Sequence, residues 1–140
     1  MTLEGSNKIL KQHLFSQENL DRYTTNDGSL SLYSHYYEET FHNTFGARKE
    51  SEEKFISPSQ LDRFSSTKGL RLLDVCFGLG YNTACLLERV LRQRTNIQAW
   101  GLEIDKRPLE LGLGDYKFRK NWSPYILNCL KSLEDSGQWH

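Results

Sequence analysis

The stretch LLDVCFGLGYNT, residues 72–83, constrains the fold more than any other part of the chain. An apolar run ends in an acid, Asp74, and two glycines two positions apart, Gly78 and Gly80, follow it. Glycine packs no side chain and costs backbone entropy, so this spacing indicates a turn that is tight or that lets a ligand approach the backbone. Apolar residues at helical spacing come next, so the stretch predicts a strand, a glycine turn and a helix.

The segments around the turn predict one βαβ unit. LRLLDV, residues 70–75, has the non-alternating apolar pattern of a strand that helices cover on both faces. The helix TACLLERVLRQR follows, with Asn82 or Thr83 as a plausible N-cap. NIQAWGLEI, residues 96–104, is the second strand, and strands joined in this way are parallel with a right-handed crossover.

The rest of the chain predicts mainly helices and one hairpin. The hairpin turns at Asn26-Asp27-Gly28, whose residue types tolerate the positive φ values that such turns require. The polar stretch that follows shows no clear element up to Ile56, and Pro58 is expected to open a short helix, SPSQLDRF. Further helices are expected from their periodicity over residues 7–20, 105–114 and 123–137.

Composition excludes several function classes. Eighteen basic and eighteen acidic residues cancel, which gives no support to a long-range field for nucleic acid or membrane. No apolar run approaches the roughly 18–20 residues of a membrane-spanning helix, and the start has no signal-peptide pattern. Three cysteines without CxxC spacing indicate reduced thiols, and four histidines without ligand spacing predict no metal site. We therefore expect a globular cytoplasmic domain.

Three interpretations of the glycine turn compete. In the first, the glycines only connect strand and helix, because short glycine patterns are weak evidence by themselves. In the second, the turn binds a dinucleotide, but the GxGxxG pattern would need glycine at Thr83, and Asp74 would repel the phosphates. In the third, it binds S-adenosylmethionine, which carries a sulfonium and an ammonium and no phosphate. The carboxylate of Asp74 favours this third interpretation.

A second acid follows the second strand. Glu103 stands 23 residues after Gly80, near the position where a carboxylate accepts hydrogen bonds from the ribose hydroxyls of a bound nucleoside. Asp105 could take this role instead, although an Asp ahead of Pro108 is also a common helix start. The alternative for both acids is that they are solvated turn residues, and the sequence leaves this choice open.

These motifs together resemble a known family. DVCFGLGYNT and GLEIDKRPLEL, preceded by DGSLSLYSHYYEETFHNTFGARKESEEKFI, resemble the methyltransferase domain of MnmC-type tRNA-modifying proteins over about residues 22–112. The phrase FGLGxNT and the upstream pattern of DGS, ExxFHxxxGAxxE and KFI are more specific than a pair of glycines. The resemblance implies transfer of a methyl group from S-adenosylmethionine to the aminomethyl group on carbon 5 of a tRNA wobble uridine, with tRNA as partner.

The resemblance also implies binding residues, while it leaves the catalytic ones unassigned. Those for the cofactor lie on the turn and after the second strand: Asp74, Phe77, Gly78, Gly80, Asn82 and Glu103. His42, Gly46 and Glu50 match the upstream pattern, and they either border the same pocket or form a folded segment without ligand contact. Cys76 stands where the family has glycine, which predicts crowding of the site. Replacing Gly80 by valine is expected to remove cofactor affinity and leave the fold largely intact.

The implied fold is α/β, with two parts. Residues 1–66 would form an N-terminal helix and hairpin cap segment, and residues 67–140 the first βαβ part of a Rossmann-like class I methyltransferase fold. The family continues through further strands and a DxFxP motif, which this chain lacks. We therefore expect a truncated domain of low activity, whose open sheet edge is covered by self-association or by a second polypeptide. The alternative function is a non-catalytic remnant that binds cofactor or serves as an interaction module.

Overall fold

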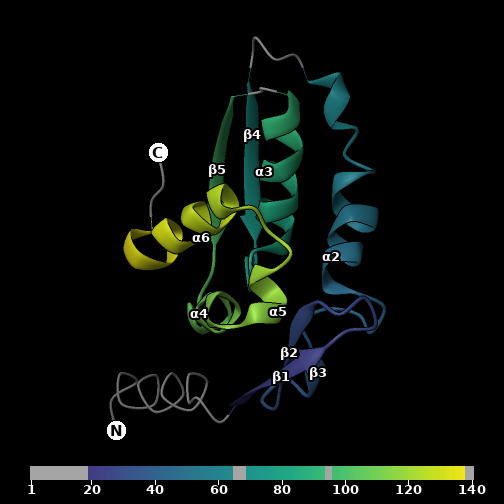
Figure 1. Cartoon of the computed structure of the whole chain (residues 1–140), viewed down its shortest axis with the longest axis vertical. Coiled ribbons are helices and arrows are strands. Elements are labelled where there is room, and N and C mark those ends of the chain that lie inside the picture. The colour runs from purple at the N-terminus through teal and green to yellow at the C-terminus, as the bar shows by residue number, and fades with distance from the viewer. Residues whose placement is uncertain (1–18, 65–68, 94–95, 138–140) are drawn as a thin grey trace, which may run out of the picture.

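The computed structural model describes residues 19–64, 69–93 and 96–137, which form two small sheets and the helices around them. Figure 1 shows the antiparallel sheet at one end of the molecule and the parallel strands running lengthwise beside the helix α3. The helix expected over residues 7–20 lies outside the described residues except at its end, where Leu20 begins a strand.

The predicted hairpin is confirmed. Strands β1 (Leu20–Thr24) and β2 (Leu30–Ser34) pair antiparallel, and β3 (Glu39–Thr40) adds a short third strand beside β2. In the turn, the carboxylate of Asp27 accepts hydrogen bonds from the Thr25 hydroxyl at 2.7 Å and from the Ser29 backbone N–H at 2.9 Å. The turn residues therefore fix the hairpin through side-chain bonds as well as through backbone conformation.

A helix lies where the sequence showed no clear element. Helix α2 (Ala47–Glu50) continues into the π-helical segment η2 (Ser51–Ile56), and the ion pairs Lys49–Glu53 and Glu50–Lys54 follow helical spacing. Proline cannot continue a helix, and Pro58 lies in the turn after this one. The helix predicted to begin there is wrong; that region holds one short 3₁₀ turn, η3 (Leu61–Arg63).

The βαβ unit is confirmed. Strands β4 (Leu70–Val75) and β5 (Ile97–Leu102) pair in parallel, and α3 (Tyr81–Gln93) connects them. The predicted N-cap at Asn82 or Thr83 is wrong by at least two residues, because the helix already begins at Tyr81 and the Ala84 N–H donates to the Gly80 carbonyl at 2.9 Å. The glycine turn therefore leads directly into the helix.

Three helices complete the described chain: α4 (Arg107–Gly114), α5 (Tyr116–Arg119) and α6 (Pro124–Ser136). The α6 helix starts at the predicted place because the Ser123 hydroxyl accepts from the Ile126 N–H, and it ends at Gly137, which has a φ of 70°. In Figure 1, α4 and α5 lie beside the antiparallel sheet, and α6 passes in front of β5.

Helices cover only one face of the β4–β5 sheet. Residues Leu70, Leu72 and Ile97 point to the core, whereas the residues between them alternate to the other face. Four apolar residues on that face expose half or more of their surface: Leu73 59%, Val75 59%, Trp100 51% and Leu102 54%. The expectation that helices cover both faces of β4 is wrong for the described residues.

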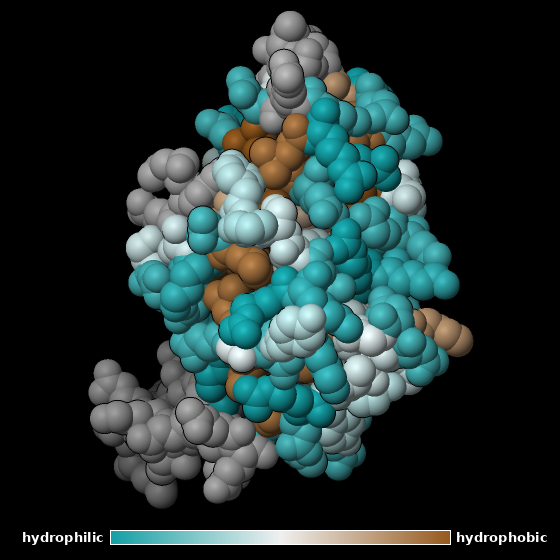
Figure 2. All heavy atoms as spheres, in the orientation of Figure 1, coloured by the Kyte–Doolittle hydropathy of each residue, from teal (hydrophilic) through white to brown (hydrophobic). Residues whose placement is uncertain are grey.

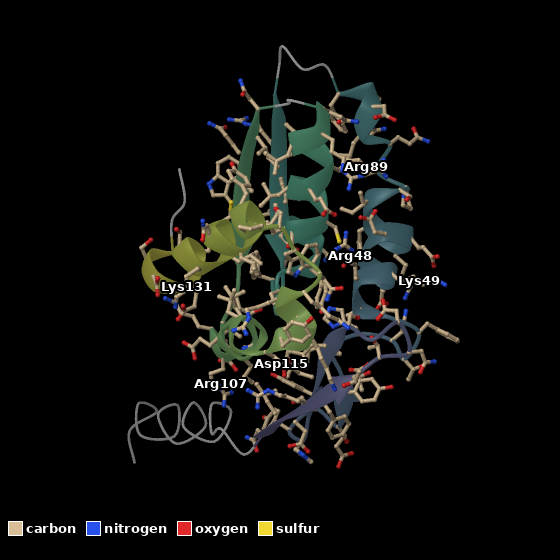
Figure 3. All side chains as sticks on the ribbon, viewed as in Figure 1. Arg48, Lys49, Arg89, Arg107, Asp115 and Lys131 are labelled. Atoms are coloured by element: carbon tan, nitrogen blue, oxygen red, sulfur yellow. The ribbon has the colours of Figure 1, made fainter. Side chains whose placement is uncertain are left out.

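One hydrophobic core joins the antiparallel sheet to the βαβ unit. It contains Leu30 and Leu32 from β2 and Phe118, Ile126 and other residues from the later helices. Arg48 reinforces the junction, since its guanidinium lies over the Trp122 ring, pairs with Glu88 and donates to a backbone carbonyl at residue 121. In Figure 3, Arg48 points from α2 toward α3, while Lys49 points away.

The space-filling view shows how hydrophilic and hydrophobic residues are distributed on one face of the molecule (Figure 2). Hydrophilic residues cover most of the visible face, and hydrophobic residues come into view over the region of β4, β5 and α3 (Figure 2). Large exposed hydrophobic residues also lie on other elements, among them Phe45, Ile104 and Tyr116.

We predict that Tyr81→Phe lowers the free energy of unfolding by about 1–3 kcal/mol, because a buried hydrogen bond is lost and the Leu30 carbonyl keeps no partner for it. The Tyr81 hydroxyl donates to that carbonyl at 2.9 Å, and Tyr81 is 1% exposed. Urea denaturation measures the change. Tyr116→Phe, at a side chain 70% exposed, is the matched control and should have no measurable effect. Equal stability of wild type and Tyr81→Phe would contradict the prediction.

Candidate functional site

The turn between β4 and α3 has an unusual backbone. Gly78 and Gly80 have φ values of 56° and 84°, and Cys76 has a φ of 60° in the left-handed region. Left-handed conformation costs a residue with a side chain about 1–2 kcal/mol. The cysteine at a position that would suit glycine therefore places strain in the backbone at the carboxyl end of β4.

The Phe77 ring lies between two glycines of neighbouring segments. A Cβ on Gly80 would lie 2.7 Å from the ring, and a Cβ on Gly101 of β5 would also lie 2.7 Å from it. Glycine at both places therefore makes room for the ring. The structure argues against the expectation that Gly80→Val leaves the fold largely intact, because a side chain at that position meets the Phe77 ring.

Asp74 turns inward from the end of β4. It is 6% exposed, and its carboxylate accepts a hydrogen bond from the Thr83 hydroxyl at 2.7 Å, in the first turn of α3. Burial raises the pKa of Asp74, and hydrogen bonds from Thr83 and Asn82 oppose the rise. A helix N-terminus attracts anions, so this carboxylate already occupies the position at which a phosphate would be favoured.

Glu103 joins the ends of the two parallel strands. Its Oε2 accepts from the Gly78 N–H at 2.7 Å, and its Oε1 accepts from the N–H groups of Ile104 at 2.7 Å and Asp105 at 3.1 Å. A carboxylate offers about four acceptor positions. One therefore stays available on Oε2, at the side of the glycine turn.

Asp105 has a different set of partners. Its carboxylate accepts from the Arg107 backbone N–H at 3.0 Å and forms an ion pair with the Arg107 guanidinium at 2.6 Å. The backbone bond supports the start of α4, although the N-cap position itself falls on Lys106. Asp105 therefore stabilises the first turn of α4, as its position before Pro108 suggested.

A cavity of about 600 Å³ opens beside the turn. Its lining comes from the segment after β3, from η2 and η3, from β4 and from the start of α3. Four of the predicted cofactor residues line it together with two upstream ones: Asp74, Phe77, Gly78, Asn82, His42 and Glu50. Of the two alternatives for His42 and Glu50, the structure therefore supports the border of the same pocket.

The other predicted residues lie around this cavity. Gly80 faces the Phe77 ring, as described above. Glu103 lines a second cavity of about 110 Å³, next to Ile104, Tyr36 and Tyr37, and the Phe41 ring lines both cavities. Gly46 packs elsewhere: a Cβ there would lie 2.1 Å from the Asp27 carboxylate, so its role in the upstream pattern is packing against the hairpin turn.

His42 is held by two neighbours. Its Nδ1 lies 3.0 Å from the Ser31 hydroxyl oxygen, and its ring stands edge-on to Tyr81 with the centroids 5.1 Å apart. Burial lowers the pKa of His42 from 6.5 to about 4, against the charges of Glu50 and Asp27, which raise it. The imidazole is therefore neutral at physiological pH.

The cavity is acidic beside the glycine turn. Asp74 and Glu50 line it there, whereas its two arginines, Arg63 and Arg71, come from η3 and from the start of β4 at the other end of the strand. No lysine is among the described residues that line it. This distribution of charge favours a cationic ligand at the turn over an anionic one.

Sequence reasoning missed several residues that shape the site. Ser31 and Tyr81 hold His42 in place, and Phe41 and Ile104 line the cavities. Phe41 was within the FHN part of the quoted pattern, which was a usable signal. Ser31 gave none, because an alternating strand residue reveals no distant partner.

The chain was compared with known proteins. No family model matches it. Protein MJ0670 of Methanocaldococcus jannaschii, described as uncharacterized, is 40% identical over 63 residues, which are 45% of this chain and 17% of that protein. The crystal structure of MnmC2 from Aquifex aeolicus matches with a TM-score of 0.55 and 31% identity, over 74% of this chain and 37% of that one. The chain thus spans about a third of MnmC2 and less than a fifth of MJ0670.

The comparison with MnmC2 confirms the expected fold class. The chain is a mixed α/β protein with a partial Rossmann-like arrangement, and it has an MnmC-like methyltransferase fold. Within the described ranges, none of the helices has the length and apolar character needed to cross a membrane. The same ranges hold no group of three or more His, Cys, Asp or Glu residues placed to hold a metal ion.

We predict that Gly80→Ala lowers the free energy of unfolding by about 1–3 kcal/mol, because the new side chain combines left-handed strain with a clash against Phe77. Gly114→Ala is the matched control, since a Cβ there would meet nothing within 4 Å. That variant should be as stable as wild type or up to about 1 kcal/mol more stable. Thermal or urea unfolding compares the three proteins, and equal stability of both variants would contradict the prediction.

We further predict that stability falls on acidification from pH 6.5 to 4. In this window the unfolded chain protonates His42 and the folded chain does not, so the unfolding free energy rises with pH. A pKa near 4 corresponds to about 3 kcal/mol across the window. Urea unfolding from pH 4 to 7.5 measures it. His42→Gln takes up no proton and should lose this part of the slope; an unchanged slope would assign the effect to other groups.

Proposed function

We propose that this chain is an S-adenosylmethionine-binding, methyltransferase-like domain that acts on the aminomethyl group of a tRNA wobble uridine. The observation that carries the proposal is the placement of two acids, Asp74 and Glu103, at the carboxyl ends of adjacent parallel strands around a glycine turn. Ligands of open α/β sheets bind at this edge. The MnmC-like fold supports the chemistry, and the tRNA substrate rests on the resemblance of the motifs.

The residues present fit the cofactor. A cavity of about 600 Å³ falls within the range of small-molecule sites. Glu103 keeps an acceptor position for a ribose hydroxyl, whereas the Asp105 oxygens are engaged by Arg107, so we assign the ribose to Glu103. Ile104, which is 80% exposed, and the tyrosines of the smaller cavity offer apolar surface for an adenine ring.

The charge distribution of the cavity favours S-adenosylmethionine over a dinucleotide as the ligand. When bound, S-adenosylmethionine supplies a methyl group on a positively charged sulfonium. Asp74 and Glu50 give the cavity a negative potential at the turn, which favours such a cation. The start of α3, which would bind a pyrophosphate, already carries the carboxylate of Asp74. The chain's own residues would thus bind and orient the cofactor and keep phosphates out.

A second candidate function is an interaction module that binds cofactor without catalysis. The observation that favours it is the uncovered face of the β4–β5 sheet, with Leu73, Val75, Trp100 and Leu102 exposed. Contiguous apolar surface of this kind marks interaction sites. A second copy of the chain or another polypeptide is the partner we propose for this candidate.

The cofactor assignment predicts preferential binding of S-adenosylhomocysteine over NAD by the full chain, measured by calorimetric titration. Glu103→Gln should weaken the affinity for S-adenosylhomocysteine about tenfold or more, because a hydrogen bond to a charged acceptor becomes one to a neutral group. Glu110→Gln is the matched control, at an exposed acid of α4, and should bind as wild type does. NAD binding as tight as S-adenosylhomocysteine binding would overturn the assignment.

Transfer of a labelled methyl group separates the two candidate functions. The full chain is incubated with labelled S-adenosylmethionine and either aminomethylated or unmodified tRNA. Label in the aminomethylated tRNA alone supports the transferase. Binding of S-adenosylhomocysteine without any incorporation supports the interaction module.

A further inference from the structure

The lining of the large cavity includes two polar side chains from the cap segment, His42 and Glu50, besides the residues of the glycine turn. We propose that His42 and Glu50 hold the amino-acid end of the cofactor, the carboxylate on His42 and the ammonium on Glu50. This inference rests on the proposed function and adds the residues that recognise one part of the ligand. Both residues would act as binding residues, with no part in the methyl transfer itself.

Position supports the assignment. The residue before His42 packs on the turn, since the Phe41 ring lies 3.4 Å from the place that a Cβ on Gly78 would take. His42 and Glu50 line the same cavity as Gly78 and Asn82. Residues of the cap segment and of the glycine turn therefore line one and the same cavity.

The hydrogen bonding of His42 makes its outer nitrogen a donor. Ser31 is 0% exposed. Among the described residues, its hydroxyl has the His42 Nδ1 as its hydrogen-bond partner. A buried hydroxyl proton requires an acceptor, so Ser31 donates to Nδ1 and the proton of the neutral imidazole is on Nε2. Nε2 makes no hydrogen bond to the described residues and is not among their buried atoms without a partner, so it is open to the cavity.

Glu50 provides the complementary acceptor. Its Oε2 accepts from the Asn43 N–H at 2.8 Å, and its Oε1 pairs with Lys54, whose side chain is 59% exposed. Burial raises the pKa of Glu50, but these hydrogen bonds lower it by more, so the pKa lies below its usual value. Glu50 is therefore ionised at physiological pH. About two acceptor positions are left for an ammonium group.

The charges around the pair favour a zwitterion over either single charge. Asp74 and Glu50 are the acidic groups at the turn end of the cavity; Lys54 pairs with Glu50, but neither lysine nor arginine lines that end among the described residues. A free carboxylate would be repelled there, and a free cation would leave the Nε2–H of His42 without an acceptor. An α-amino acid group satisfies both side chains at once.

The test compares two ligands that differ only at this end: S-adenosylhomocysteine, and 5′-methylthioadenosine, which lacks the ammonium and carboxylate groups. Calorimetric titration of the full chain measures both affinities. His42→Ala and Glu50→Gln should each weaken S-adenosylhomocysteine binding about 10- to 100-fold and leave 5′-methylthioadenosine binding within about twofold. His35→Ala and Glu53→Gln, at exposed residues of the same cap segment, are the matched controls and should change neither.

The outcomes separate this inference from the proposed function. If His42→Ala and Glu50→Gln lose affinity for both ligands equally, the residues act through folding and the inference is overturned. If the variants keep the wild-type affinity for both ligands, the inference is also overturned, although the proposed function stands. If the wild-type chain binds neither ligand, the proposed function fails and the inference fails with it. Should His42→Ala not fold, as judged by thermal unfolding, His42→Asn and Glu50→Gln carry the same comparison.

Discussion

The Tyr81 side chain is the contact on which the arrangement of this protein depends. Its ring packs against His42, Phe118 and Trp122, with centroids 5.1, 5.1 and 5.6 Å from its own, and its hydroxyl binds the Leu30 carbonyl. Tyr81 is also the first residue of α3, directly after the glycine turn. One aromatic residue thereby fixes the hairpin, the later helices and the turn relative to one another, and the cavity exists between parts that it holds together.

The acidic residues of the site form hydrogen bonds within the protein that stabilise the glycine turn and the start of α3. Asp74 binds the first turn of α3, and Glu103 binds the Gly78 N–H. Because these carboxylates satisfy donors that would otherwise be buried without partners, they stabilise a turn that has positive φ values at Cys76, Gly78 and Gly80. Asp74 has a second effect, since together with Glu50 it makes the turn end of the large cavity acidic, which favours a cation. Structure and binding chemistry therefore share the same side chains.

The parallel sheet connects the two candidate functions. Its covered face supports α3 and the turn, and its other face leaves Trp100 and three aliphatic residues in solvent. Burying these four apolar side chains against a partner would be favourable, because it removes apolar surface from water. Leu73 and Val75 of this uncovered face also line the large cavity, so the surfaces of the two candidate functions overlap at β4.

The sequence by itself determined the local elements and the chemistry of the turn. An apolar run, a pair of glycines and a 3.6-residue period are local signals, so β4, α3, β5 and the hairpin were predictable, as were the acids at the carboxyl ends of the two parallel strands. The helix over α2 and η2 was missed because its polar residues give no apolar stripe, and its stability comes from Arg48, Ala47 and Ile56 packing against distant residues.

Tertiary structure alone decided which residues share a cavity. His42 reaches the glycine turn only because Ser31 and Tyr81 hold it there, and the wedge of Phe77 between Gly80 and Gly101 joins positions on different segments. Our proposal of Glu103 over Asp105 for the ribose likewise depends on tertiary contacts, because Arg107 forms an ion pair with the Asp105 carboxylate. Which sheet face is covered was equally undecided, because an apolar strand pattern has the same form whether or not a second layer of helices is present.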